Sequence, residues 1–271
     1  MIYTAYYYSG SLANGDLIIR DNRFYPGKYF ETFPVWLKYV RKNFPNEHII
    51  IFADSDSPIS IERGLEFIKE PYEIFDDVWQ MNFEVKIHVR ILTEHTGKYF
   101  WAMQRNLVEA MCMAYELEDD MFWLDNDAFL NSNFLQDVDG FDVVAPQINH
   151  QQFTCDSVCT YISNSRLHDN DKYFHLPSYL RHVLNNAPID TRMHSLQEGG
   201  LYKMFCYGRV KSHTNVNLSH LSCYENFMKF LAKNPLNTEE WNQLYLSLEE
   251  FDFSKIPNVQ LEFHDMYYEE K

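Results

Sequence analysis

The stretch Met121-Phe122-Trp123-Leu124-Asp125-Asn126-Asp127 decides the fold of this chain and the place where its chemistry is expected. Four apolar residues run directly into two carboxylates, and Ala128-Phe129-Leu130 follow them. A short apolar run of this kind is typical of a strand that is buried on both faces of a sheet. In open α/β sheets ligands bind beyond the carboxyl ends of the strands. The two aspartates therefore stand at a predicted ligand edge.

Strands and helices are predicted to alternate before this stretch. Apolar runs predict strands at residues 2–8, 49–53 and 85–92, and apolar residues at helical spacing predict helices at residues 29–43 and 99–116. Residues 11–27 are rich in turn formers, and we expect a loop there. The alternation indicates an α/β fold with a mostly parallel, mixed central sheet that is flanked by helices, Rossmann-like in its N-terminal half.

The second half of the chain is less regular than the first. Strands are predicted at 143–145 and 158–162, and helices at 173–185, 197–205, 224–233 and 239–250. No linker-like segment interrupts the 271 residues, so a single domain is expected over 1–271.

The charge and composition of the chain exclude several classes of protein. Lys and Arg total 23 against 39 Asp and Glu, a formal charge of −16, which argues against nucleic acid or an anionic membrane as partner. The N-terminus lacks the pattern of a signal peptide, and no run approaches the ~18 apolar residues of a membrane span. The five cysteines are odd in number and scattered, as in a reducing compartment. We therefore expect a cytoplasmic protein with no integral membrane segment.

Asp125 and Asp127 form a candidate metal site. Two carboxylates two residues apart at the end of a strand can reach one hard cation, and Mg²⁺ or Mn²⁺ prefers oxygen ligands. The alternative is a turn whose acids point into solvent. Apolar runs on both sides of the pair favour the metal site over that surface turn.

The motif Asp125-Asn126-Asp127 resembles the D-x-D signature of nucleotide-sugar-dependent glycosyltransferases with the type A (GT-A) fold. The segment from Gln104 to Ala110, which contains Arg105 and Asn106, and the segment from Phe122 to Phe129 extend the resemblance. The latter is similar to the corresponding segment of galactosyl- and xylosyltransferases, and the whole resemblance covers about residues 2–134. The size of the chain is also loosely similar to that of small glycosyltransferases of large DNA viruses.

The resemblance implies a function and its cofactor. Residues 1–130 would bind a nucleoside-diphosphate sugar, with UDP-xylose, UDP-galactose or UDP-glucose favoured, and residues 131–271 would bind the glycan or glycoprotein acceptor. The enzyme would transfer the sugar to an acceptor hydroxyl with Mn²⁺ or Mg²⁺, and inversion at the anomeric centre is favoured.

Two alternatives to this function stay open. One is a nucleotidyltransferase, disfavoured because residues 5–20 hold only Gly10, Gly15 and Arg20 where a glycine-rich basic phosphate loop is expected. The other is a catalytically inactive nucleotide-sugar-binding protein, against which the two intact aspartates count.

The resemblance also implies the residues that hold the nucleotide. Tyr6, Tyr8 and Ser9 would contact the nucleoside, although tyrosines in a strand also simply fill a core. Asp54 would contact the base, or else cap a helix or turn. Arg105 would reach the base or the diphosphate, or else be a solvated helix arginine.

Metal ligation is distributed over three residues in this scheme. Asp125 would touch the ribose or bind the metal through water, and Asp127 would bind the metal directly. The third ligand is expected near the C-terminus, where His220 is the candidate and His213 the runner-up.

Glu198 is the candidate catalytic base of an inverting reaction. It precedes Gly199 and Gly200, which permit close approach of a substrate, at an expected helix start. The alternative is an acid that only complements the helix dipole. If the reaction retains configuration, Gln197 would face the sugar instead, and Asp156 and Asp190 are lesser candidates for the base.

Overall fold

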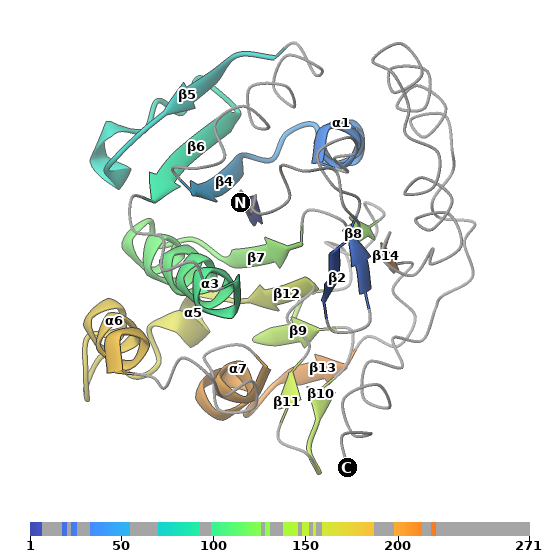
Figure 1. Ribbon diagram of the computed structural model, residues 1–271. Coiled ribbons are helices and arrows are strands. Elements are labelled where there is room, and N and C mark those ends of the chain that lie inside the picture. Colours follow the sequence, from blue (N-terminus) through green and yellow to red (C-terminus); the bar gives the residue numbers. More distant parts are fainter. Residues whose placement is uncertain are drawn as a thin grey trace.

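The centre of the molecule is one large twisted sheet with helices on both faces (Figure 1). The computed structural model describes residues 1–6, 18–20, 23–25, 33–54, 70–92, 99–125, 128–130, 138–145, 148–151, 154–155, 159–186, 198–212 and 218–220. Its strands are β1 (Ile2–Tyr6), β2 (Ile18–Arg20), β3 (Arg23–Tyr25), β4 (Ile49–Asp54), β5 (Tyr72–Ile74), β6 (Ile87–Leu92), β7 (Met121–Leu124), β8 (Ala128–Leu130), β9 (Val143–Ala145), β10 (Ile148–Asn149), β11 (Thr154–Cys155), β12 (Cys159–Ile162), β13 (Val210–Ser212) and β14 (Leu218–His220). Its helices are α1 (Phe33–Asn43), the 3₁₀ helix η2 (Val78–Gln80), α3 (Tyr99–Glu116), α5 (Asn164–Leu167), α6 (Leu176–Asn186) and α7 (Glu198–Phe205).

In the described part of the chain, the large sheet has eight strands in the order β13-β9-β12-β7-β1-β4-β6-β5. β1 pairs in parallel with both β4 and β7, and β4 continues in parallel to β6 and then β5. Only β12 runs against its neighbours β7 and β9, and β13 is parallel to β9. The predicted α/β fold with a mostly parallel, mixed sheet flanked by helices is confirmed. The sheet takes strands from both halves of the chain.

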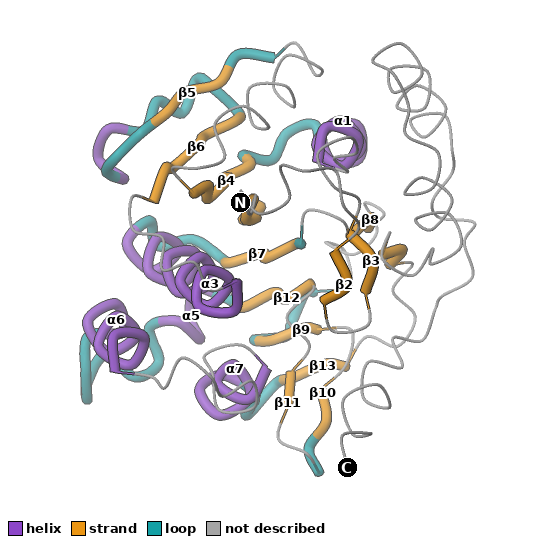
Figure 2. The backbone as a smooth tube through the Cα atoms, viewed as in Figure 1, coloured by secondary structure: helices purple, strands orange, loops and turns teal. Residues whose placement is uncertain are grey.

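Helices cover the two faces of this sheet unequally, as Figure 2 shows. α1 packs on one face: its Trp36, Leu37 and Val40 are buried, and Phe44, just after it, meets Phe122 of β7 edge to face. α3 lies on the other face, where its apolar residues share one core cluster with alternate residues of β1, β4 and β7. α5, α6 and α7 extend the layer on that side. The strands are therefore apolar on both faces, as the sequence predicted.

The loop predicted over residues 11–27 is wrong in part. Within it β2 and β3 pair as an antiparallel hairpin, with Ile18 opposite Tyr25 and Arg20 opposite Arg23. The physical signal is a pair of β-forming triplets separated by two turn-forming residues, the spacing of a tight hairpin. Counting turn formers over the whole segment concealed it.

Helix α6 begins later than predicted. It starts at Leu176 rather than at Tyr173, and Pro177 is therefore in its first turn. Proline lacks a backbone donor and is tolerated in the first turn of a helix, but not in its interior. The predicted helices at 224–233 and 239–250 lie outside the described residues, as do residues 7 and 8 of the first predicted strand.

Short strands complete the described part of the chain. β5 and β13 form the two edges of the large sheet, and β10 pairs with β11, and β8 with β14, as two small antiparallel sheets. None of these six short strands was predicted. Runs of two or three residues show no alternation, and five of the six also lack the fully apolar run by which β9 was predicted. None of the described helices combines the length and the apolar character needed to span a membrane.

Candidate functional site

The carboxyl ends of β1, β4 and β7 lie side by side at one edge of the sheet, which we call the carboxyl edge. Tyr6, the last residue of β1, pairs with Ala53, and Asp54 ends β4 opposite Leu92. Asp125 follows the last residue of β7, on the other side of β1. Because neighbouring strands lie about 4.8 Å apart, the backbones that carry Asp54 and Asp125 are separated laterally by about 10 Å. The fold thus brings Tyr6, Asp54 and Asp125 to one edge.

Asp125 is held by its own strand. It is partly buried, and the indole Nε1 of Trp123 donates a hydrogen bond of 2.8 Å to its Oδ1. Residues two apart in a strand point to the same face, which explains the contact. A partly buried carboxylate at a strand end is the kind of oxygen ligand that hard cations take. The donor type therefore fits Mn²⁺ or Mg²⁺.

The small sheet of β8 and β14 brings His220 next to the segment that contains the two aspartates. β8 begins directly after Asp127, and β14 pairs with it in antiparallel register, so that His220 lies opposite Ala128. Directly opposed residues of an antiparallel pair have Cα atoms about 4.5–5.5 Å apart. His220 is therefore next to the residue that follows the Asp125-Asn126-Asp127 motif, although the two segments are far apart in the sequence.

Three consecutive buried polar residues lie in the first half of α3. Gln104 and Arg105 are almost fully buried and Asn106 is completely buried. Nη2 of Arg105 donates to Oδ1 of Asn106 at 3.4 Å, whereas Nδ2 of Asn106 has no hydrogen-bond partner among the described residues. The alternative of a solvated helix arginine at position 105 is therefore wrong. Because α3 ends just before β7 begins, its first half extends toward the carboxyl edge.

Glu198 is the first residue of α7, as predicted. The end of α7 leads within a few residues into β13, whose start at Val210 pairs with the start of β9. The C-terminus of α7 is thus at the amino end of the sheet. Eight helical residues span about 12 Å, so Glu198 stands about that far from the end of α7 that leads into β13.

Several predicted site residues lie outside the described residues: Tyr8, Ser9, Asp127, and the lesser candidates His213, Gln197, Asp156 and Asp190. Of the remaining candidates, the structure describes the backbone of Tyr6, Asp54, Glu198 and His220 and the side chains of Arg105 and Asp125. Within that described set, no three His, Cys, Asp or Glu side chains are gathered as a metal centre.

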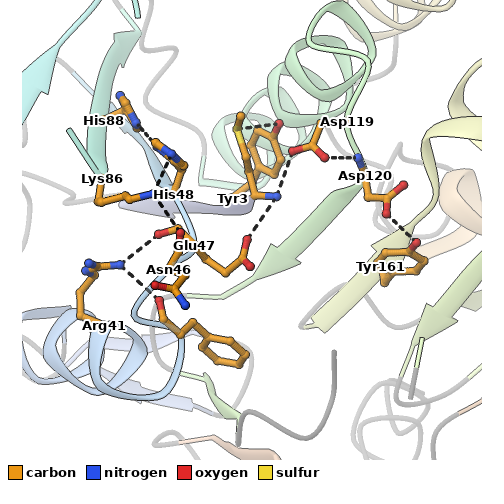
Figure 3. Close-up of polar contacts among 12 residues, drawn as sticks. Tyr3, Arg41, Asn46, Glu47, His48, Lys86, His88, Asp119, Asp120 and Tyr161 are labelled. Atoms are coloured by element: carbon orange, nitrogen blue, oxygen red, sulfur yellow. Dashed lines mark hydrogen bonds and ion pairs between the residues drawn. The ribbon is translucent and has the colours of Figure 1, made fainter. Parts of the chain in front are cut away.

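The opposite edge of the sheet, the amino edge, carries a separate polar network (Figure 3). His48 and Lys86 directly precede β4 and β6, and Asp119 and Asp120 come just before β7. The α-amino group of Met1 lies 3.1 Å from Oδ2 of Asp119. Because these groups are at the far ends of the strands, they do not belong to the carboxyl edge.

A hydrogen-bonded chain runs through this network from Lys86 to Glu73. Nζ of Lys86 is 3.1 Å from Nε2 of His48, Nδ1 of His48 is 2.8 Å from Nε2 of His88, and Nδ1 of His88 is 2.6 Å from Oε1 of Glu73. An ammonium group only donates, so Nε2 of His48 accepts and each imidazole carries its proton on Nδ1. Both imidazoles are therefore neutral in this arrangement.

The pKa values of the two histidines agree with that arrangement. Burial, followed by the charge of Lys86, lowers the pKa of His48 from 6.5 to about 4. Burial also lowers the pKa of His88, against the opposing effect of its hydrogen bond to Glu73. The network thus favours the neutral form of both imidazoles over the protonated form.

The role of Trp123 was missed by sequence reasoning. In the sequence it is one of four apolar residues of a predicted strand, whereas in the structure its indole Nε1 donates to the candidate ligand Asp125. The available signal was the spacing: a donor-bearing aromatic residue two positions before a carboxylate in a strand shares its face.

Comparisons with known proteins find only distant structural similarity for this chain. The sequence matches no protein-family model and no curated protein. Among solved structures it is similar to the nucleoside-diphosphate-sugar pyrophosphorylase of Vibrio cholerae, with 10% identity, 85% of this chain and 99% of that chain covered, and a TM-score of 0.45. It is also similar to the glycosyltransferase GlyE of Streptococcus pneumoniae (9%, 93% and 60%, TM-score 0.44) and to the inositol-1-phosphate CTP transferase of T. maritima (11%, 92% and 96%, TM-score 0.38).

Proposed function

We propose that this chain is a transferase that binds a nucleoside-diphosphate sugar at the carboxyl edge and moves the sugar to a hydroxyl of a glycan acceptor. The observation that supports this most strongly is the pairing of β8 with β14, which lays His220 opposite Ala128. Two segments far apart in the sequence thereby bring the backbone of His220 next to the residue that follows the Asp125-Asn126-Asp127 motif. Oxygen and nitrogen donors together suit Mn²⁺, and the carboxylates alone suit Mg²⁺.

In this proposal Asp125, Asp127 and His220 hold the cation. A bound Mn²⁺ or Mg²⁺ supplies Lewis-acid neutralisation of the charge that grows on the departing diphosphate. The net charge of −16 makes such a local positive centre necessary for binding a diphosphate. The buried guanidinium of Arg105, in the half of α3 that extends toward this edge, adds positive potential there.

The remaining residues of the carboxyl edge bind the donor and the acceptor. Tyr6, Tyr8 and Ser9 at the end of β1 contact the nucleoside, and Asp54 at the end of β4 reads the base. Glu198 accepts the proton of the acceptor hydroxyl at a carboxylate oxygen, within about 3 Å of it, in an inverting transfer. Its place as the first residue of α7, directly before Gly199 and Gly200, supports this role.

A nucleotidyltransferase is the second candidate, and one structural observation favours it. The β2–β3 hairpin places Arg20 directly opposite Arg23 shortly after β1. Two arginines in register are a basic pair of the kind that holds phosphates. The segment after the first strand therefore offers a second basic residue, Arg23, in addition to Arg20.

One set of incubations separates these functions. The protein is mixed with Mn²⁺ and a panel of UDP- and GDP-sugars, and in parallel with nucleoside triphosphates and sugar phosphates. Release of UDP or GDP supports the glycosyltransferase, whereas release of pyrophosphate supports the nucleotidyltransferase. UDP binding with no turnover identifies an inactive binding protein, and absence of both binding and turnover overturns the proposal.

Matched variants tie the result to the carboxyl edge. Asp127→Asn and His220→Ala are expected to remove the Mn²⁺-dependent activity, while His182→Ala, an exposed histidine of α6, leaves it unchanged. Thermal unfolding gives a check without turnover, because UDP and Mn²⁺ at about 100 times their Kd stabilise the fold by about 2.7 kcal/mol. That stabilisation is expected to need Asp127 and not His182.

A further inference from the structure

Trp123 is buried in the core and also makes a polar contact with Asp125. Its side chain is 1% exposed, among the largest buried side chains, and its Nε1 donates 2.8 Å to Oδ1 of Asp125. An indole has a single polar atom, which is donor-only. This one donor makes its hydrogen bond to the carboxylate of Asp125 at the carboxyl edge.

The indole is fixed by its neighbours in the sheet. Trp123 pairs with Tyr3 of β1 on one side and with Thr160 of β12 on the other, and both of these residues are fully buried. Tyr3 in turn stacks on Phe52 of β4, with ring centroids 6.4 Å apart and an interplanar angle of 10°. A row of buried side chains therefore crosses four strands and leaves the indole no freedom to turn.

We infer that Trp123 is a positioning residue, whose indole N–H sets the orientation of the Asp125 carboxylate for the cation of the proposed nucleotide-sugar site. The inference rests on the proposed function. Groups that hydrogen-bond a metal ligand from behind fix its orientation, and their loss typically costs tenfold to a hundredfold in metal affinity. The rigid sheet core is thereby connected to a carboxylate at the end of a strand.

A purely structural role predicts something different. In that case the carboxylate exists to satisfy the buried indole N–H, and removing the indole affects stability alone. The two roles are distinguished by the cation affinities of two variants that lose a similar amount of stability, one at Trp123 and one at a second buried tryptophan. Trp36 of α1 is that second tryptophan, because it is completely buried on the opposite face of the sheet.

The test compares Trp123→Phe with Trp36→Phe. Mn²⁺ affinity is measured by titration calorimetry on the full chain in the presence of UDP, and stability by thermal unfolding. Trp123→Phe is expected to weaken Mn²⁺ binding about tenfold, with a higher KM for the metal-dependent reaction, while Trp36→Phe changes affinity by less than twofold. Equal affinities in the two variants overturn the inference. Absence of Mn²⁺ binding in the wild type instead overturns the proposed function.

A spectroscopic measurement on the wild type covers the case in which Trp123→Phe does not fold. The chain holds five tryptophans, so ¹⁵N labelling of tryptophan yields five indole N–H signals, which single Trp→Phe substitutions at the other four positions assign. Adding Mg²⁺ and UDP is expected to shift the Trp123 signal, while that of Trp79, which is 86% exposed, stays in place. A Trp123 signal that does not move when the complex forms overturns the inference.

Discussion

Replacing His48 with glutamine should remove an acid-sensitive part of the stability of this protein. His48 is neutral in the chain from Lys86 to Glu73 and has a pKa of about 4 in place of 6.5. Above pH 6.5 it is neutral in both the folded and the unfolded chain, so it contributes no pH dependence there. Between pH 6.5 and 4 the unfolded chain takes up a proton that the folded chain refuses. The free energy of unfolding therefore falls as the pH falls through this window.

The magnitude follows from the pKa of His48. A fall from 6.5 to about 4 covers about 2.5 pH units, which at 1.36 kcal/mol for each unit corresponds to about 3 kcal/mol. His48 is only partly buried, and solvent screening reduces this figure to about 1–2 kcal/mol. At pH 5 somewhat more than half of the window has been crossed. The expected loss between pH 7.5 and pH 5 is therefore about 1 kcal/mol.

Urea unfolding at pH 7.5 and pH 5.0 measures this loss. The wild type is compared with His48→Gln, which keeps a hydrogen-bonding side chain but cannot titrate, and with His182→Gln, an exposed control on α6. The difference in unfolding free energy between wild type and His48→Gln should shift by about 1 kcal/mol between the two pH values. His182→Gln measures what a change from histidine to glutamine does to the unfolding free energy at an exposed position. If the His48 difference is the same at both pH values, His48 is not held neutral in the folded protein by this hydrogen-bonded chain.

Three further predictions concern the ion pair of the buried Arg166, two glycines with positive φ, and a buried cysteine of α3. Asp142→Asn should lower the free energy of unfolding by about 3 kcal/mol in urea titrations, because Nη2 of the buried Arg166 loses an anionic partner at 2.8 Å. Gly208→Ala should destabilise more than Gly140→Ala: both positions have positive φ, but an added Cβ at Gly208 would lie 2.8 Å from Nη2 of Arg166, and at Gly140 it would meet nothing within 4 Å. Equal melting temperatures for the two variants would contradict this. Burial raises the pKa of the Cys112 thiol to about 12, so iodoacetamide at pH 8 should leave it unmodified in the folded protein and alkylate it in urea.

Local pattern was sufficient for the long elements of the fold. The spacing of apolar residues predicted α3 at its observed bounds, Tyr99–Glu116, and the apolar runs predicted β4, β7 and β9 to within a residue. These elements are long enough, or apolar enough on both faces, for their own sequence to dictate them. The hairpin of β2 and β3 was hidden because turn residues dominate the composition around it.

Some features of the candidate site likewise follow from local sequence, whereas others depend on tertiary packing. The sequence placed Asp125 at the end of a buried strand, Asp54 at the end of another, and Glu198 at the start of a helix, because each of these positions depends on its immediate neighbours. It did not indicate that Arg105 is buried, since burial in a helix depends on what packs against it. It also did not assign a partner to the indole of Trp123, although that partner, Asp125, lies only two residues further along the chain.

By itself, then, the sequence determined that an α/β sheet forms and that a pair of aspartates lies at the end of one of its strands. Only the tertiary structure decided that His220, among eleven histidines, is opposite Ala128 beside that motif. The physical reason is that hydrogen bonding between strands joins segments without regard to their separation in the chain, whereas side-chain periodicity reports only on the element that carries it. For the same reason, the hydrogen-bonded chain from Lys86 to Glu73 became visible only once three strands were in register.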